Sequence, residues 1–325
     1  MKIFCRIFSL LIMLSVLVLW LPACGGDTLS TDESKLKIKI IVKKRDADFF
    51  NVVRMGAEAA GKEFNAEVEY DGPDSEKDID KQIKMVDQAI SEQFNAIVLA
   101  AADYNRLAPV AEKAANQNIP VIIIDSQLNS DRINTFIGTD NIDAGNRLGS
   151  TLISRVGTDC KIAVMNFIKG AASSDLREKG LYEVIDRYPS VKVVSNLYCN
   201  SDESLAYQLT QQAVKDNPDL KAIVCTNAYG AVGTARAIKS EKLSGKVKII
   251  GLDSTPEQAD FLEKGVIEAL VIQNPFNMGY LGISYAIASI NHKPVPKNTN
   301  TGLTIIDRDN MYLPENEKLV FPFIE

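Results

Sequence analysis

Short apolar runs alternate with longer segments of helical spacing along almost the whole chain. The runs at 96–100 and 121–124 are Ala-Ile-Val-Leu-Ala and Val-Ile-Ile-Ile, with no polar residue inside them. Continuous runs of this kind are typical of parallel strands that are buried on both faces. The residues between them, at 107–117, have the spacing of a helix that ends before Pro120. The pattern therefore predicts an α/β fold with parallel sheets.

The number of such units predicts two domains. We expect strands at 36–42, 67–70, 96–100, 121–124, 135–137, 161–166, 191–197, 222–225, 247–252, 267–272 and 301–306. We expect helices at 49–64, 78–91, 107–117, 143–155, 175–187, 203–215, 231–239, 256–263 and 278–290. So many strands exceed those of a single barrel, and 325 residues are many for one core. We therefore predict two doubly wound parallel sheets, with a break near Thr139 and Asp140.

The N-terminus has the pattern of an export signal. Lys2 and Arg6 give it a positive start, and an apolar run at 7–20 follows. This run is short for a membrane-spanning helix and suits a signal peptide. It closes on Leu-Pro-Ala-Cys at 21–24, which resembles the lipobox of bacterial lipoproteins.

The lipobox resemblance implies that residues 1–23 are a removed signal peptide and that Cys24 is the lipidated first residue of the mature chain. Ordinary cleavage after Ala23, with Cys24 incidental, is the alternative. The segment after the cysteine is small and polar, so we expect a lipid-anchored flexible tether at 24–35. The expected location is extracytoplasmic, on the face of the cell membrane, in a single- or double-membrane host.

The charge of the chain makes nucleic acid an improbable partner, because the formal net charge is −6. The short basic cluster Lys43-Lys44-Arg45 at the end of a predicted strand is expected to be solvated. Cys160, Cys199 and Cys225 remain once the N-terminal cysteines are set aside, and three cannot all pair within one chain. Cys225 lies in an apolar strand and is predicted to be a buried thiol.

The apparatus of an enzyme is missing from the sequence. The single histidine, His292, lies in a predicted loop far from any strand end, so a Ser-His-Asp triad cannot form. The chain has no phosphate loop, no GxGxxG and no Cys/His cluster. We therefore expect no enzymatic activity, no cofactor and no metal.

Polar residues stand where four predicted strands end. These residues are Asp125, Asn227, Asp253 and Gln273. Each ends an apolar run and precedes a helix, so all four are expected at the carboxyl edges of the sheets, where ligands of α/β proteins bind. Any one of them alone is equally well explained as a turn former or a helix cap. Together, two carboxylates and two amides favour a cleft for a neutral polyhydroxyl ligand.

The best-defined helix start follows Asp253. Thr255 is expected as the N-cap and Pro256 as the first helical residue, while Gln258 stands where a capping box has Glu or Gln. This arrangement holds Asp253 between a buried strand and a helix N-terminus.

These residues lie in motifs that resemble those of the ribose-binding members of the type I periplasmic binding proteins. The motifs are Asp48-Phe49-Phe50, the strand-end Asp125, Arg177 in Leu176-Arg-Glu-Lys-Gly180, Asn227 in Cys225-Thr-Asn-Ala, Asp253 in Gly251-Leu-Asp-Ser-Thr-Pro256, and Gln273. The resemblance covers the chain from about residue 36 to its C-terminus. Members of this family are the sugar-recognising subunits of ATP-driven importers.

The resemblance implies a role for each matched residue. Phe49 and Phe50 would sandwich the apolar face of a sugar, although Phe50 could instead be a staple for the next helix. Arg177 would line the cleft, although a solvated helix position is the alternative. Asp125, Asn227 and Asp253 would bind ligand hydroxyls, and Gln273 would sit at the hinge.

Three positions depart from the family pattern and leave the sugar open. Ala47 replaces an Asn that precedes the two phenylalanines, and Ser126 replaces an Arg that follows the strand-end Asp. The aromatic residue of the far wall is replaced by Ser201 or by a shifted Tyr198.

The family architecture implies two lobes joined by a three-segment hinge, with the ligand cleft between them. The crossings are expected near 139–140, 273–274 and 301–303. The N-terminal lobe would comprise 36–139 plus 274–302, and the C-terminal lobe 140–273 plus 303–325.

The implied function is capture of a small neutral sugar by hinge closure and its delivery to the permease of an ABC transporter, by a monomer. The sugar would be a pentose such as ribose or xylose, or a hexose. Alternatives are a sugar-sensing subunit that docks to a membrane histidine kinase or chemoreceptor, and an autoinducer-2 binding protein.

Overall fold

The computed structural model describes residues 35–133 and 135–323. The expected signal peptide, the lipidation site Cys24 and nearly all of the expected tether lie outside these residues. Within the described ranges, no helix is both long enough and apolar enough to cross a membrane.

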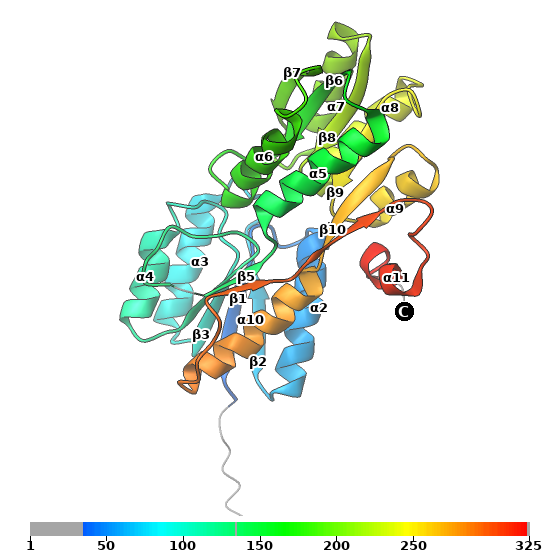
Figure 1. Cartoon of the computed structure of the whole chain (residues 1–325). Helices are drawn as coiled ribbons and strands as arrows, with labels where there is room; N and C mark the ends of the chain where they lie inside the picture. Colours follow the sequence, from blue (N-terminus) through cyan, green and yellow to red (C-terminus); the bar gives the residue numbers. More distant parts are fainter. Residues whose placement is uncertain (1–34, 134, 324–325) are drawn as a thin grey trace, which may run out of the picture. The chain divides into compact units, whose positions relative to one another are not determined.

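The first lobe is built on a six-stranded parallel sheet with the order β11-β5-β4-β3-β1-β2. Its strands are β1 (Lys37–Ile41), β2 (Glu67–Asp71), β3 (Ala96–Leu99), β4 (Val121–Ile124), β5 (Phe136–Gly138) and β11 (Asn298–Asn300). Its helices are α2 (Asp48–Glu63), α3 (Ile79–Ser91), α4 (Ala108–Asn116) and α10 (Pro275–Ile290). Figure 1 shows α10, coloured orange, beside α2, although the two are far apart in sequence.

The second lobe has a six-stranded sheet with the order β12-β10-β9-β8-β6-β7. Its strands are β6 (Cys160–Asn166), β7 (Val191–Tyr198), β8 (Leu220–Cys225), β9 (Lys248–Leu252), β10 (Ala269–Gln273) and β12 (Leu303–Ile306). Its helices are α5 (Asn141–Val156), α6 (Ala172–Ile185), α7 (Glu203–Asp216), α8 (Ala228–Ser240), α9 (Pro256–Glu263) and α11 (Pro314–Val320). The two lobes confirm the predicted doubly wound α/β class.

The end of the chain differs from the prediction in two ways. The strand expected at 301–306 begins at Leu303 as β12 of the second sheet, and β11 of the first sheet, which precedes it at Asn298–Asn300, was not predicted. Gly302, with a left-handed backbone angle (φ 83°), lies between the two strands. β12 runs antiparallel to β10, so the second sheet is mixed. Helix α11 was not predicted, because its seven residues are too few to display a helical period.

Three helices, α6, α8 and α10, begin three residues earlier than predicted, and asparagine side chains cap the last two. Asn227 accepts the N–H of Gly230 at the start of α8, and Asn274 accepts the N–H of Asn277 at the start of α10. Both caps bring a helix directly onto the end of a strand, which is where the predicted ligand residues stand.

Each sheet is buried on both faces. In the first lobe, α2 and α10 pack on one face around Ile40 and Ile283, and α3 and α4 pack on the other around Ile97. The crossing of α2 and α10 depends on glycine, since a Cβ on Gly279 would lie 1.9 Å from the carbonyl oxygen of Val53. This close packing holds the N-terminus of α2 against the carboxyl edge of the first sheet.

Candidate ligand-binding cavity

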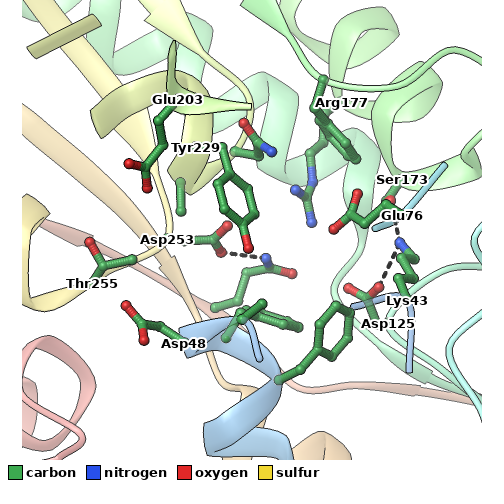
Figure 2. A pocket seen from close by; sticks show the side chains of 17 residues that line it. Lys43, Asp48, Glu76, Asp125, Ser173, Arg177, Glu203, Tyr229, Asp253 and Thr255 are labelled. Atoms are coloured by element: carbon green, nitrogen blue, oxygen red, sulfur yellow. Dashed lines mark hydrogen bonds and ion pairs between the residues drawn. The ribbon is translucent and has the colours of Figure 1, made fainter. Parts of the chain in front are cut away.

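A cavity of about 620 Å³, counted to its open mouth, lies between residues of the two lobes (Figure 2). Phe49, Phe50, Asp125, Arg177, Asn227, Asp253 and Gln273, the seven predicted site residues, all line it. It is also lined by residues that were not predicted to bind ligand: Lys43, Ala47, Asp48, Glu76, Phe167, Ser173, Glu203, Ala228, Tyr229 and Thr255.

Asp253 leaves the end of β9 with a left-handed backbone angle (φ 73°), and the residue is 7% exposed. The side-chain amide of Gln273 donates to its Oδ1 at 2.6 Å. Burial raises the pKa of Asp253, while the nearby guanidinium of Arg177 acts to lower it. The two predicted residues Asp253 and Gln273 therefore form one buried polar unit on neighbouring strands.

The helix start after Asp253 is half of the expected capping box. Thr255 is the N-cap of α9 and accepts the backbone N–H of Gln258 at 3.1 Å. The side chain of Gln258 does not return to Thr255. It donates instead to the carbonyl oxygen of Leu252, because it is fully buried beneath the end of β9. Gln258 thus ties α9 to the strand that carries Asp253.

Asp125 is held by an ion pair with Lys43, whose Nζ lies 2.7 Å from its Oδ2. The prediction of a solvated cluster at 43–45 is wrong for Lys43, which is 3% exposed. The reason is its position at the edge of the sheet. The N–H of Val42 donates to the carbonyl oxygen of Asp71 and so continues the pairing of β1 with β2. The side chain of Lys43, the next residue, then meets Asp125 at the end of β4. Arg45 is exposed, as predicted.

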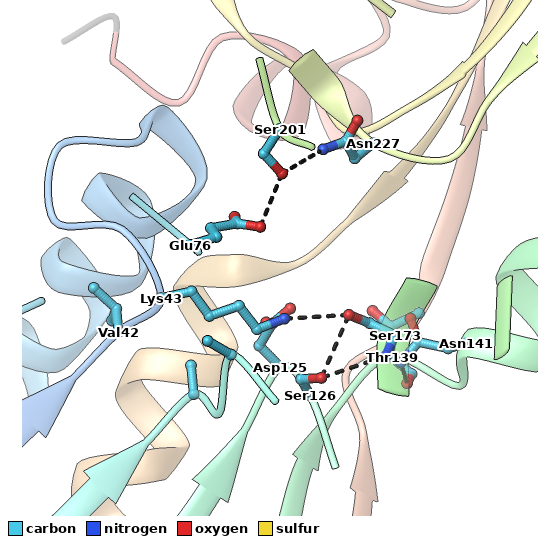
Figure 3. A network of polar contacts seen from close by, with 12 residues as sticks. Val42, Lys43, Glu76, Asp125, Ser126, Thr139, Asn141, Ser173, Ser201 and Asn227 are labelled. Carbon is cyan, nitrogen blue, oxygen red and sulfur yellow. Dashed lines mark hydrogen bonds and ion pairs between the residues drawn. The ribbon is translucent and has the colours of Figure 1, made fainter. Parts of the chain in front are cut away.

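Lys43 also reaches the second lobe (Figure 3). Its ammonium donates to Ser173 Oγ at 3.2 Å. Ser126, which stands where the family pattern has an arginine, accepts the backbone N–H of Ser173 at 3.4 Å. Where the family pattern has an arginine, this chain therefore has a serine that touches the opposite lobe, and a lysine from the segment after β1 lies beside the aspartate.

Arg177 is 3% exposed, so the alternative of a solvated helix position is wrong. Its Nε donates to Asn141 Oδ1 at 2.8 Å, and one terminal nitrogen donates to the carbonyl oxygen of Thr226 at 3.0 Å. The guanidinium carbon lies 5.6 Å from the centre of the Phe167 ring. The side chain is thereby fixed in the cavity wall with its charge next to Asp253.

Asn227 combines the two roles that the sequence left open, because it caps α8 and also lines the cavity. Its Oδ1 accepts the N–H of Gly230 at 2.9 Å, which leaves its Nδ2 to donate to Ser201 Oγ at 3.3 Å. Ser201 in turn donates to Glu76 Oε2 at 2.8 Å, and Figure 3 shows this chain of contacts between the lobes. The position expected for a far-wall aromatic is therefore polar.

The aromatic walls come from both lobes. Phe49 and Phe50 are edge to face, with ring centres 5.1 Å apart. Phe50 is 3% exposed and packs in the core as well as lining the cavity, so the staple alternative is also part of its role. In the second lobe, Phe167 and Tyr229 supply the rings. Tyr198 does not line the cavity and donates to Glu178 at 2.6 Å.

Other chemically active groups lie away from the cavity. His292 is exposed in a loop. The three cysteines Cys160, Cys199 and Cys225 are buried and free, and burial raises the pKa of the Cys225 thiol to about 12. Among residues 35–133 and 135–323, no group of His, Cys, Asp and Glu is arranged to hold a metal ion.

Two α/β lobes with a polar and aromatic cavity between them are the architecture of a periplasmic binding protein. A family model described as a periplasmic binding protein domain matches residues 38–294, and the chain belongs to this family.

The relatives of this chain include sugar-binding proteins. The D-allose-binding periplasmic protein of Escherichia coli is 25% identical over 278 residues, which are 82% of this chain and 89% of the relative. An ABC transporter solute-binding protein from Agrobacterium vitis with bound D-fucose is 33% identical, with a TM-score of 0.85 over 87% of this chain and 99% of that one. A carbohydrate transporter solute-binding protein from Agrobacterium radiobacter in complex with D-arabinose is 30% identical, with a TM-score of 0.86 over 88% of this chain and 99% of that one.

Proposed function

We propose that this protein captures a monosaccharide outside the cytoplasm by closure of its two lobes and delivers it to an ABC importer. The observation that carries the proposal is that both lobes contribute residues to the cavity walls. Carboxylate, amide and guanidinium groups from both lobes converge on one space between two sets of aromatic rings. Such a set can bind hydroxyls on the rim of a sugar and stack on its apolar faces. The sugars held by the similar structures from Agrobacterium support the same ligand class.

The proposed ligand contacts are the seven predicted residues and Lys43. Asp125 and Asp253 accept ligand hydroxyls, and Arg177 and Lys43 donate to ligand oxygens. Asn227 and Gln273 bind through their amides, while Phe49 and Phe50 stack against the ring. The buried hydrogen bonds of Arg177 and Gln273 support this assignment, because they hold both side chains in place before ligand enters.

The proposed motion is hinge closure between lobes 36–139 plus 274–302 and 140–273 plus 303–325. A ligand that contacts both lobes stabilises the closed state by its difference in affinity for the two states. Binding of this kind needs no covalent step, and we propose that the protein is not an enzyme. The proposed partner is a membrane permease, which receives sugar from a monomer anchored by a lipid on Cys24.

A thermal-shift screen tests the proposal on the full chain purified in detergent. The panel is D-ribose, D-xylose, D-arabinose, D-fucose, D-allose, D-galactose and autoinducer-2. A ligand that binds only the folded state at a hundred times its Kd adds about 2.7 kcal/mol to stability, so at least one sugar is expected to raise the Tm by several degrees.

Arg177→Lys should reduce that shift, because lysine cannot keep the two fixed hydrogen bonds of the guanidinium. Arg187→Lys is the matched control, since Arg187 is an exposed arginine outside the cavity. The proposal fails if no sugar shifts the Tm of the unaltered protein.

A further inference from the structure

The carboxylates of the cavity outnumber the cations that neutralise them. Three carboxylates have a cation nearby: Asp125 is paired with Lys43, Asp253 has Arg177 close to it, and Glu203 is paired with Arg236. Among the described residues, no ion pair joins Asp48 or Glu76, which also line the cavity. The balance of charge around the ligand space is therefore negative.

Glu76 is the deeper of these two carboxylates. Its side chain comes from the loop between β2 and α3 and is only 9% exposed. The ammonium groups of Lys43 and Lys44 act on it from a distance, but neither forms an ion pair with it, and Lys43 is paired with Asp125 and donates to Ser173. A buried carboxylate without a direct cation is unfavourable, and a proton or a cation from elsewhere would relieve it.

The hydrogen bonds around Glu76 favour its ionised form as the acceptor. The Oδ1 of Asn227 is occupied by the N–H of Gly230, so its Nδ2 faces Ser201 and donates to it. Ser201 is then free to give its own hydrogen to Glu76 Oε2. The chain of donors begins at an amide and ends at a carboxylate, and among the described residues no donor bonds the second oxygen of Glu76.

A second acceptor, on a residue that lines the cavity, has no partner in the described structure. The Oε1 of Gln273 is buried and accepts no hydrogen bond in the described structure, while its Nε2 is held by Asp253. Gln273 is 2% exposed and lines the cavity. The residues that line the cavity therefore include acceptors without a bonded donor, and the carboxylates among them outnumber the cations.

We propose that Glu76 determines specificity and that the ligand is an amino monosaccharide whose protonated amine lies against the Glu76 carboxylate. This inference rests on the proposed function and replaces the expectation of a neutral sugar. The ammonium supplies the missing cation and up to three hydrogen-bond donors. Glu76 thus gives the site a preference that no other buried carboxylate of the cavity supplies, because Asp125 and Asp253 already have cations nearby.

Calorimetric titration of the full chain in detergent tests the inference. The probes are D-glucosamine, D-galactosamine and D-mannosamine, each compared with its parent hexose and with any neutral sugar that binds in the screen above, at a pH where the amine is protonated. At least one amino sugar is expected to bind about tenfold or more tightly than its parent and than the neutral sugars. Glu76→Gln should remove this preference, whereas Glu58→Gln, on the exposed face of α2, should keep it.

The outcomes separate this inference from the proposed function. If a neutral sugar binds as tightly as every amino sugar or more tightly, the preference for a cation is overturned and monosaccharide capture stands. If an amino sugar is preferred equally by the Glu76→Gln variant, the assignment to Glu76 is overturned. If no sugar of either kind binds, both the inference and the proposed function are overturned.

Discussion

Asp125 and Asp253 occupy corresponding places in the two lobes. Each follows the last residue of a buried strand, β4 or β9, and each has a left-handed backbone angle, φ 62° and 73°. Each donates its backbone N–H to the neighbouring strand, to the carbonyl oxygens of Ile137 and Val271. Aspartate tolerates this backbone region better than most residues, so one conformation turns a carboxylate from each sheet towards the cavity.

Asp253→Asn is expected to weaken sugar binding by about 1.5–3 kcal/mol, at least roughly tenfold in affinity. Asparagine keeps the side-chain shape and the left-handed backbone, so the change removes the charge and one acceptor without adding strain. Calorimetric titration with the best ligand of the screen measures the loss. Asp216→Asn, at the exposed end of α7, is the control, and equal affinities of the two variants would remove Asp253 from the ligand site.

Lys43→Met is expected to destabilise the fold by about 3–5 kcal/mol, because it leaves Asp125 charged and buried. The side chains of this pair are 4% and 6% exposed. Lys37→Met breaks a pair with Glu67 whose side chains are 58% and 48% exposed, and should change stability by less than about 1 kcal/mol.

Urea unfolding of both variants gives the comparison. Adding Asp125→Asn to Lys43→Met should restore part of the loss, since no charge then remains without its partner. An equal effect of Lys43→Met and Lys37→Met would show that the Asp125 pair is not a buried ion pair in solution.

Glu76 should make the ligand-free protein less stable as pH rises. Burial raises the pKa of Glu76 above its ordinary value, although Lys43 and the Ser201 hydrogen bond act against the shift. The folded state then binds the proton of Glu76 more tightly than the unfolded state does. The stability that this proton adds to the folded state is therefore present in acid and is lost as pH rises from about 4 through the raised pKa.

Urea unfolding of the unaltered protein and of Glu76→Gln across this range tests the sign. The difference in unfolding free energy between them should move in favour of the variant as pH increases. A difference that is independent of pH, or that moves the other way, contradicts a raised pKa at Glu76. Glu58→Gln should track the unaltered protein throughout.

Cys24→Ser is expected to abolish attachment of lipid and to release the protein from the membrane. The reason is chemical, since the proposed anchor requires a thiol at the first mature residue. Expression in a bacterial host with a labelled fatty acid, followed by membrane fractionation, gives the readout. Cys160→Ser serves as the control, and label retained by the Cys24 variant would exclude the lipobox assignment.

The strand ends were predictable because apolar runs define them without any tertiary information. Asp125, Asn227, Asp253 and Gln273 each follow such a run, and all four line the cavity. The same holds for α9, where Thr255 as the N-cap and Pro256 as the first helical residue indicate the helix start. Local sequence patterns were sufficient wherever the position of a residue depends on the element it ends.

Lys43 and Glu76 were not predicted, because their burial depends on contacts between distant segments. In the sequence, Lys43 is part of a basic cluster, and only the fold places Asp125, at the end of β4, beside it. Glu76 is an ordinary polar loop residue in the sequence, and only the fold places Ser201 of the other lobe against it. The direction of β12 was missed for a similar reason. A strand of four residues carries no sign of the neighbour with which it pairs.

The return of α10 to the first sheet has a consequence for the order in which the protein can fold during synthesis. Ile283 and Ala286 of this helix close the same core as Ile38, Ile40 and Ile122. The ribosome makes them only after every strand of the second sheet except β12. The half of the protein that is translated first therefore cannot be completed first, and it must wait, with one face of its sheet partly uncovered, while the second half emerges.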